Sequence, residues 1–228
     1  MNVLWNPLFL SLKVAIISTI INTMLGVIIA FLLVQCRFRL LSNILGTILL
    51  LPLILPPTVI GYYLIILFGQ NGFLGKFFSK FGINVIFTWY GALIASIVTS
   101  FPLLLTSARR AFENVDQNIE DAGRVLGLSE ITLFLKITLP LASNGIIAGM
   151  LLSFARALGE FGATLMIAGN LSGYTQTISG AIYEAIYTGK TFEAGLLVVT
   201  ISIICIVVLL IIEYKFLSRI SHSSRRKR

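Results

Sequence analysis

The sequence predicts an all-α membrane protein with about five or six transmembrane helices. Three observations carry this prediction: 57% of the 228 residues are hydrophobic, only 11% are charged, and the mean hydropathy is +0.97. A soluble domain normally carries about 25% charged residues, so this chain has too few charges to cover a water-exposed surface. Each helical crossing needs about 20 apolar residues, and the chain length leaves room for roughly five crossings with modest loops.

Five apolar segments are long enough to be these crossings, and we expect them at about residues 10–34, 45–68, 85–107, 139–168 and 195–217. The stretch from Val14 to Val34 is too long for the apolar part of a cleaved signal peptide, so we expect it to remain as the first span. The second segment contains Pro52, Pro56 and Pro57, which remove backbone donors and should kink or break its helix. Because the freed carbonyl groups need partners in lipid, this span is expected inside a helix bundle.

The spans are expected to form one transmembrane domain over residues 8–218, followed by a basic tail over residues 219–228. The formal net charge is +8, and much of it lies near the C-terminal end. Basic residues beside a final span usually indicate cytoplasmic placement, so we do not interpret this charge as a nucleic-acid-binding surface. Cys36 and Cys205 lie at the end of one apolar run and inside another, and we interpret both as small hydrophobic residues.

The distribution of Lys and Arg predicts the orientation in the membrane. With the C-terminus inside the cell, twelve of the 17 basic residues lie in cytoplasmic segments and four in external ones, while Arg156 lies within a span. Cytoplasmic loops carry an excess of positive charge. An odd number of spans puts the termini on opposite sides, so we expect the N-terminus outside and the C-terminus inside. The loop over residues 108–138 then faces the cytoplasm.

This cytoplasmic loop carries a helix signal. Asp116 can cap a helix, and Glu120 and Asp121 lie in its early turns, where the helix dipole favours acids. Apolar residues recur at helical spacing and form one face of this helix; they are Val115, Ile119, Ala122 and Leu126.

The end of the same loop carries stop and start signals. Gly127 can adopt the left-handed conformation that ends a helix, and Ser129 can cap a second short helix. Pro140 suits the first turn of the next span. The pattern therefore predicts a helix, a tight turn, a second helix and entry into the membrane. Periodicity alone also allows an amphipathic helix that lies on the bilayer surface.

A spaced pattern in this loop resembles a known family. The residues that carry it are Asp121-Ala122-Gly123, Gly127, Ile137, Leu139 and Pro140. Their spacing agrees with the pattern E-A-A-x3-G-x9-I-x-L-P of the "EAA" loop in permeases of ATP-binding cassette (ABC) importers. Asp121 replaces the Glu of the pattern and Gly123 its second Ala, although Glu120 is adjacent. In that family the loop is a coupling helix that fits a cleft on the ATP-hydrolysing subunit, so the resemblance implies an ATPase-coupling site at these residues.

Three further segments are similar to the molybdate permease branch of this family: Leu51–Pro57, Ser153–Thr164 and Tyr174–Ile178. Sulfate permeases share a stretch similar to R-x-L-G-E-F-G, so the second segment indicates oxyanion importers in general. The resemblance implies a permease that imports molybdate or tungstate, with sulfate or another oxyanion as the alternative.

The resemblance also implies an assembly in the cytoplasmic membrane. A type I ABC permease of this kind works as a homodimer, because one copy supplies only half of the helices of a pathway. Two ATP-binding subunits would dock on the two loops, and an extracytoplasmic oxyanion-binding protein would cap the dimer. ATP and Mg would be used by the partner ATPase, and no cofactor or metal is expected on this chain.

Arg156 and Glu160 are charged residues within the fourth predicted span. Residues four apart share one face of a helix, and a charge in a span usually faces a bundle interior or an aqueous path. We expect first a mutually neutralising pair that fixes helix packing, because a paired arginine is not free to bind substrate. The alternative is a pathway or gate, in which Arg156 attracts an oxyanion. Gly159 and Gly162 would then mark a bend, although they equally suit close helix contacts.

The segment over residues 162–194 is expected on the external side, where a receptor would dock. Its polar residues Asn170, Thr175, Gln176 and Thr177 could face that receptor. They could equally belong to a solvated re-entrant loop.

The sequence gives no support for catalysis in this chain. It contains no G-x-x-x-x-G-K-[ST], H-E-x-x-H or G-x-S-x-G motif, and its single histidine, His222, lies in the polar tail. An ion-coupled secondary transporter is a second hypothesis. Such carriers usually show paired repeats or further carboxylates at the membrane midplane, whereas Glu160 is the sole acidic residue deep in a predicted span.

Overall fold

The long helices of the structure coincide with the apolar segments of the sequence. The computed structural model describes the backbone of residues 2–225 and the side chains of residues 5–210. Four helical stretches are long and apolar enough to cross a membrane, and a fifth crossing results if one bent helix pair is a single span. Every regular element in the described backbone is helical. The predicted all-α architecture is confirmed, with four or five candidate spans.

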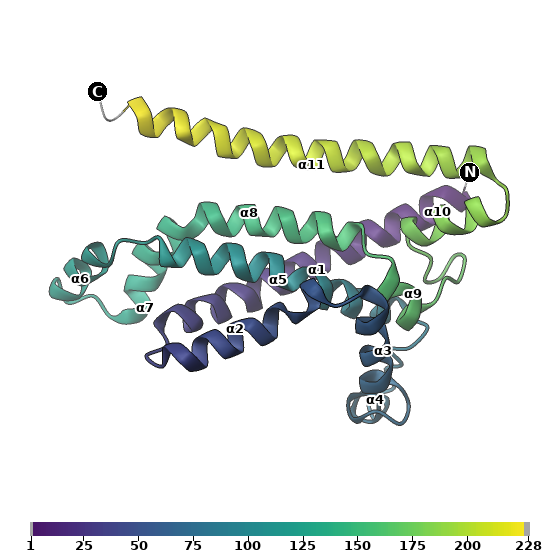
Figure 1. Cartoon of the computed structure of the whole chain (residues 1–228), viewed down its shortest axis with the longest axis horizontal. Helices are drawn as coiled ribbons and strands as arrows, with labels where there is room; N and C mark the ends of the chain where they lie inside the picture. Colours follow the sequence, from purple (N-terminus) through teal and green to yellow (C-terminus); the bar gives the residue numbers. More distant parts are fainter. Residues whose placement is uncertain (1, 226–228) are drawn as a thin grey trace.

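The helices are labelled in chain order in Figure 1. They are α1 (Asn2–Gln35), α2 (Arg39–Ile54), α3 (Pro57–Phe68), α4 (Phe73–Ser79), α5 (Trp89–Glu113), α6 (Gln117–Val125), α7 (Glu130–Leu133), the π-helical turn η1 (Phe134–Thr138), α8 (Leu139–Leu158), α9 (Gly162–Ala168), α10 (Ile178–Tyr187) and α11 (Thr191–Arg225).

The segment expected as the second span, residues 45–68, is broken at its prolines. α2 ends at Ile54 and α3 begins at Pro57, and the two helices meet at a bend of 112°. A proline has no N–H and its ring clashes with the preceding turn, so α2 cannot continue through Pro56 and Pro57. The predicted break is confirmed at Pro56 and Pro57, whereas α2 continues through Pro52. After it, α3 packs against α9.

The segment expected as the fourth span, residues 139–168, is also interrupted. α7, η1 and α8 form one continuous helical stretch from Glu130 to Leu158, and a separate short helix, α9, follows. The apolar sequence predicts a single helix here. The structure differs because the chain leaves the helix at Gly159 and Glu160, and the Glu160 carboxylate accepts a hydrogen bond from the backbone of α9.

α1, α5 and α8 lie side by side and form the centre of the bundle (Figure 1). Two glycines on α8 allow this close packing. A Cβ atom on Gly145 would lie 2.5 Å from the Cβ of Ala111, and one on Gly149 would lie 2.8 Å from the Cβ of Ser107. Small residues four apart let helix backbones approach closely in membranes, so α8 packs directly onto α5.

A polar side chain joins the same three helices. Asn22 of α1 is fully buried, and its Nδ2 lies 2.9 Å from the Oγ of Ser100 on α5 and 3.3 Å from the Oγ of Ser153 on α8. A buried amide is costly unless it is hydrogen-bonded. These contacts therefore fix the register of the three central helices.

α11 is the least embedded of the long helices. In Figure 1 it runs along the top of the bundle, from α10 toward the end at which α6 lies. Only 11% of its apolar stretch is buried, compared with 61% for α5, so most of its surface is free for lipid or a partner. The predicted basic tail, residues 219–228, begins within α11, and residues 226–228 lie outside the described residues.

The two ends of the bundle carry different short elements. We call α6, α7, η1 and the turn between them the elbow. The elbow lies at the end of the bundle toward which α11 runs, whereas the N-terminus, α9 and α10 lie at the opposite end, which we call the far end (Figure 1).

Candidate functional site

α6 forms where the loop pattern predicts a helix. The side chain of Asp116 is its N-cap, and the Oδ1 atom accepts a hydrogen bond from the backbone N–H of Asn118 at 2.9 Å. Glu120 lies in the first turn, where a carboxylate complements the helix dipole. The predicted start of the helix is confirmed.

α6 ends in a turn that requires glycine. Gly127 has a φ angle of +80°, which side chains other than glycine rarely adopt. Its N–H donates to the carbonyl of Arg124 at 2.9 Å, and the N–H of Leu128 donates to the carbonyl of Gly123 at 3.2 Å. This pair of bonds is the Schellman motif. The predicted role of Gly127 as a helix terminator is confirmed.

The second half of the elbow leads straight into α8. The Oγ of Ser129 accepts a hydrogen bond from the N–H of Thr132 at 3.4 Å and caps α7. The π-helical turn η1 follows, and Leu139 and Pro140 begin α8. Because Pro140 has no N–H, it interrupts the regular ladder of hydrogen bonds, and the wider π turn lies directly before it.

Glu120 connects α6 to the base of α8. Its side chain is buried, and its Oε1 accepts a hydrogen bond from the Thr138 hydroxyl at 2.5 Å. A buried carboxylate is stable only when it is paired or hydrogen-bonded. This contact therefore fixes the distance between α6 and η1.

Arg124 holds α6 and α7 together at the surface. Its Nη1 lies 2.8 Å from the Oδ1 of Asp121, and its Nε lies 2.9 Å from the Oε1 of Glu130. Hydrogen bonds to Glu130 and then Asp121 raise the pKa of Arg124 above its ordinary value. Water and salt weaken the attraction between exposed charges, so these contacts orient the two helices more than they stabilise them.

Gly123 explains one departure from the family pattern. A Cβ atom at this position would lie 2.5 Å from the Cδ1 of Leu133 and 3.2 Å from the Cδ1 of Ile137. The glycine thus lets α6 lie directly on α7 and η1. An alanine would fit only if the Leu133 side chain moved.

An apolar edge of the elbow faces away from the rest of the chain. Val125, Leu126 and Ile131 are 87%, 80% and 74% exposed, while Val115, the first residue of the predicted apolar face, is half-buried. Contiguous exposed apolar residues are typical of sites that contact a protein or a membrane surface. We define the apolar edge by its exposed residues Ile119, Ala122, Val125, Leu126 and Ile131.

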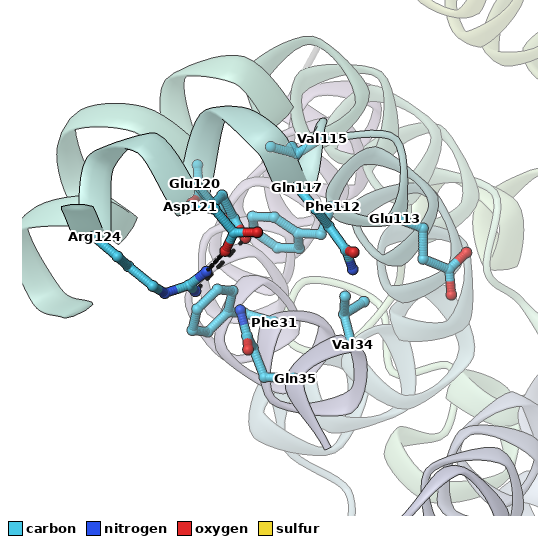
Figure 2. A pocket seen from close by; sticks show the side chains of 11 residues that line it. Phe31, Val34, Gln35, Phe112, Glu113, Val115, Gln117, Glu120, Asp121 and Arg124 are labelled. Atoms are coloured by element: carbon cyan, nitrogen blue, oxygen red, sulfur yellow. Dashed lines mark hydrogen bonds and ion pairs between the residues drawn. The ribbon is translucent and has the colours of Figure 1, made fainter. Parts of the chain in front are cut away.

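A cavity of about 380 Å³ lies behind α6, against the ends of α1 and α5. Figure 2 shows Phe31, Val34 and Gln35 of α1 on one side of it, with Asp121 and Arg124 on the other. Its acidic lining consists of Glu113, Glu120 and Asp121. Arg124 is the one cation among the described residues of the lining and is paired with Glu120 and Asp121, so carboxylates outnumber cations and the cavity is not suited to hold an oxyanion.

Arg156 and Glu160 form an ion pair at the end of α8. The Nη1 of Arg156 lies 2.7 Å from the Oε2 of Glu160, whose side chain is 1% exposed. The Oε1 of Glu160 accepts a hydrogen bond from the N–H of Ala163 at 2.8 Å. The two residues thus neutralise each other, as expected for a pair that fixes helix packing. Their role as a pathway or gate stays a prediction.

Gly162 brings two helix breaks together. A Cβ atom on it would lie 2.8 Å from the Cβ of Pro57 at the start of α3. The break in the second apolar segment and the break in the fourth are therefore adjacent in space. Gly159, by contrast, has no neighbour that would lie closer than 3.7 Å to an added Cβ, so no contact requires glycine there.

The loop before α10 is packed against the bundle. Thr175, Gln176 and Thr177 are buried. The Nε2 of Gln176 donates to the Oε2 of Glu184 at 2.6 Å, and the Nδ2 of Asn170 donates to the same oxygen at 2.9 Å. The expectation of a solvated loop is therefore wrong for Thr175, Gln176 and Thr177, because these side chains hold the loop against the bundle.

Two polar residues of α1 make contacts that the sequence pattern does not reveal. Asn22 lies in the central polar contact described above, and the Nζ of Lys13 lies 3.8 Å from the ring centroid of Trp89. The sequence signal for such contacts is a polar residue inside an apolar run, because a polar residue in a span usually faces the bundle interior. Their partners lie on α5 and α8, too distant in the sequence to be inferred.

Comparison with known proteins places this arrangement in a family. The model described as "Binding-protein-dependent transport system inner membrane component" matches residues 22–226. The molybdenum transport system permease protein ModB of Escherichia coli (strain K12) is 43% identical over 220 residues, which cover 95% of this chain and 94% of the relative. The putative molybdenum transport system permease protein YvgM of Bacillus subtilis (strain 168) is 42% identical over 212 residues, 92% of this chain and 93% of the relative.

A solved structure shares the fold. A chain of the MetNI methionine ABC transporter, in an inward-facing conformation, aligns with a TM-score of 0.74 over 94% of both chains at 15% identity. The predicted multi-pass membrane location agrees with the family description and with the four or five candidate spans. The chain belongs to the family of inner membrane components of binding-protein-dependent transport systems.

Proposed function

We propose that this chain is the permease subunit of an ATP-driven importer that carries molybdate or tungstate across the cytoplasmic membrane. The observation that carries the proposal is the elbow, a rigid projection with an exposed apolar edge, in a chain 43% identical to a molybdenum transport permease. The E. coli and B. subtilis relatives reported above are both described as molybdenum transport proteins.

The elbow suits the role of a contact for a motor subunit. Its shape is fixed by the Gly127 turn, by the Glu120–Thr138 hydrogen bond and by the ion pairs of Arg124. A rigid element transmits the movement of its partner instead of absorbing it. Two ATP-binding subunits would bind the elbows of two permease copies, and their closure on ATP and Mg would move the attached α8 helices.

The proposed orientation places the elbow in the cytoplasm and the far end outside the cell. The excess of Lys and Arg in the predicted cytoplasmic segments supports this orientation. The N-terminus and the elbow lie at opposite ends of the bundle (Figure 1), as the orientation requires. An external oxyanion-binding protein would then dock at the far end of a homodimer.

The adjacent helix breaks are the part of the bundle best suited to change shape. In many transporters, discontinuous helices line the site where substrate passes. Gly162 and Pro57 join the two breaks, and the Arg156–Glu160 pair lies directly beside them. In this proposal the pair positions the break, while the neighbouring backbone forms the gate.

Uptake measured in the assembled transporter tests the proposal. The permease would be reconstituted in liposomes with its ATPase and binding protein, and accumulation of molybdate, tungstate and sulfate would be compared with and without ATP. We expect ATP-dependent accumulation of molybdate and tungstate, with little sulfate. Accumulation driven by an ion gradient without ATP would instead indicate a secondary transporter. A preference for sulfate would overturn the assigned substrate and leave the ABC mechanism in place.

A further inference from the structure

A second cavity, of about 250 Å³, lies at the far end between the first turns of α1, the start of α5 and the loop before α10. Its polar lining residues are Asn6, Lys13, Tyr174 and Gln176, and the remaining wall is formed by Phe9, Leu10, Trp89 and Gly173. No carboxylate lines this cavity within the described part of the chain. In this respect it is the opposite of the cavity behind α6, which three carboxylates line.

Lys13 supplies positive charge to this cavity. Its Nζ lies 3.8 Å from the centroid of the Trp89 ring, and an aromatic face attracts a cation without neutralising its charge. Among the described side chains, no carboxylate lies within ion-pair distance of Lys13. Arg156 and Lys190, by contrast, are paired with Glu160 and Glu193. Lys13 is thus held in place while its N–H donors stay available.

The neutral groups around Lys13 can also serve an anion. Asn6 and Tyr174, whose side chains carry an amide and a hydroxyl group, line the same cavity. The amide of Gln176 is already bonded to Glu184 at 2.6 Å, so one carboxylate lies behind the wall and limits the positive potential. A single cation with neutral donors makes a weak anion site. Transport requires such a site, because a tightly held ion would leave slowly.

We propose that this cavity is the entry site of the permease, where Lys13 makes the first contact with a tetrahedral dianion that the binding protein releases. The inference rests on the proposed function, because it assumes that the far end faces outward and that the cargo is an oxyanion. Lys13 would form charge-assisted hydrogen bonds with the oxyanion, and Trp89 would act as a positioning residue for the Lys13 ammonium group.

The test uses the complete transporter in liposomes, with molybdate as the probe. Lys13→Met removes the charge but keeps much of the side-chain volume, and Lys13→Arg keeps the charge. Lys190→Met is the matched control, because it removes a charge at the same end of the bundle from a residue already paired with Glu193. Two quantities are measured for each variant: ATP hydrolysis stimulated by the loaded binding protein, and molybdate transported per ATP hydrolysed.

We expect Lys13→Met to lower molybdate transported per ATP by about tenfold, the effect of losing one charge-assisted hydrogen bond. Stimulated ATP hydrolysis should stay near the unmodified level, and both Lys13→Arg and Lys190→Met should transport normally. Unchanged transport by Lys13→Met would overturn the inference and leave Lys13 as a contact for lipid headgroups. A parallel loss of stimulation and transport would also overturn it, since Lys13 would then serve receptor docking or folding. If the unmodified transporter accumulates no oxyanion at all, the proposed function itself fails.

Discussion

The elbow and the far end of the bundle hold their charged side chains in different ways. In the elbow, Arg124 contacts Asp121 and Glu130 at less than 3 Å, so the positive and negative charges compensate each other within the chain. At the far end, Lys13 rests on an aromatic ring and has no carboxylate partner among the described side chains. In the functions proposed above, the elbow acts through its shape, whereas the far end keeps a charge free for a ligand.

The same difference appears in the apolar side chains. The elbow turns Val125, Leu126 and Ile131 outward on a scaffold that hydrogen bonds hold rigid. The far-end loop instead buries Thr175 and Gln176 against the bundle. One region presents an exposed apolar edge, which we propose as the surface for a partner protein, and the other closes around a cavity. Four substitutions test how far this comparison holds.

The largest effect is expected for Gly127→Pro. Proline cannot adopt the φ angle of +80° and has no N–H to donate to Arg124, so the elbow should lose its turn. We expect the variant to insert in the membrane but to lose both ATPase binding and uptake. Copurification of the ATPase with the permease measures binding.

Gly189→Pro is the matched control, because Gly189 has a φ angle of +77° in the same type of turn after α10. This variant should keep the ATPase, since its turn lies at the far end. Equal loss of ATPase from the two variants would break the comparison between the ends.

The second largest effect is expected for Glu160→Ala. This substitution removes the ion-pair partner of the half-buried Arg156 and the hydrogen-bond acceptor of the Ala163 N–H. Removal of one member of a fully buried ion pair costs about 3–5 kcal/mol, and the 31% exposure of Arg156 lowers this cost. The midpoint of thermal unfolding of the purified permease should therefore fall clearly. Asp121→Ala, at an exposed carboxylate, should hardly change it. A Glu160→Ala protein as stable as the original would show that the pair does not fix the helix break.

A smaller effect is expected for Thr138→Val, which removes the donor to the buried Glu120 carboxylate. A buried group left without its hydrogen bond costs about 1–3 kcal/mol. The elbow should become more mobile and bind the ATPase more weakly, as measured by titration of the ATPase against permease in nanodiscs. Thr138→Ser keeps the hydroxyl and should restore binding; if it binds as weakly as valine, packing and not the hydrogen bond is responsible.

The smallest effect is expected for Arg124→Gln, because the ion pairs of Arg124 are exposed and water weakens the attraction between their charges. ATPase affinity should fall only a few-fold at low salt. The difference from the unmodified protein should shrink as salt is added, since salt screens exposed charges. A large loss that does not respond to salt would mean that Arg124 contacts the ATPase directly.

The elbow could be predicted from the sequence because its determinants are local. Asp116 caps the backbone two residues away, and Gly127 closes a turn with bonds that span at most five residues. Signals of this kind depend little on the rest of the fold. The family pattern over Gly127, Ile137 and Pro140 adds a predicted function to the same local shape.

The features that the sequence did not reveal depend on contacts between distant segments. The hydroxyl of Thr138 bonds to Glu120, eighteen residues away, and Lys13 rests on Trp89 of another helix. The sequence also predicts that the α8 helix continues to residue 168, because the stretch after Leu158 stays apolar. Only the fold shows that Gly162 packs on Pro57 and that the helix is broken there. Apolar composition predicts that a segment lies in the membrane, but it does not locate a break stabilised by one buried carboxylate.

The central claim is that the elbow projects into the cytoplasm and binds a motor subunit. Cysteine crosslinking tests it most directly, with Leu126→Cys on the apolar edge and Tyr187→Cys, which is 83% exposed at the far end, as the comparison. Cys36 and Cys205 would first be replaced by serine. We expect Cys at position 126 to crosslink to the ATPase and to be shielded from an impermeant thiol reagent added outside the cell. Cys at position 187 should react with that reagent and form no crosslink to the ATPase. Labelling of position 126 from outside, or its failure to reach the ATPase in the assembled transporter, would contradict the account.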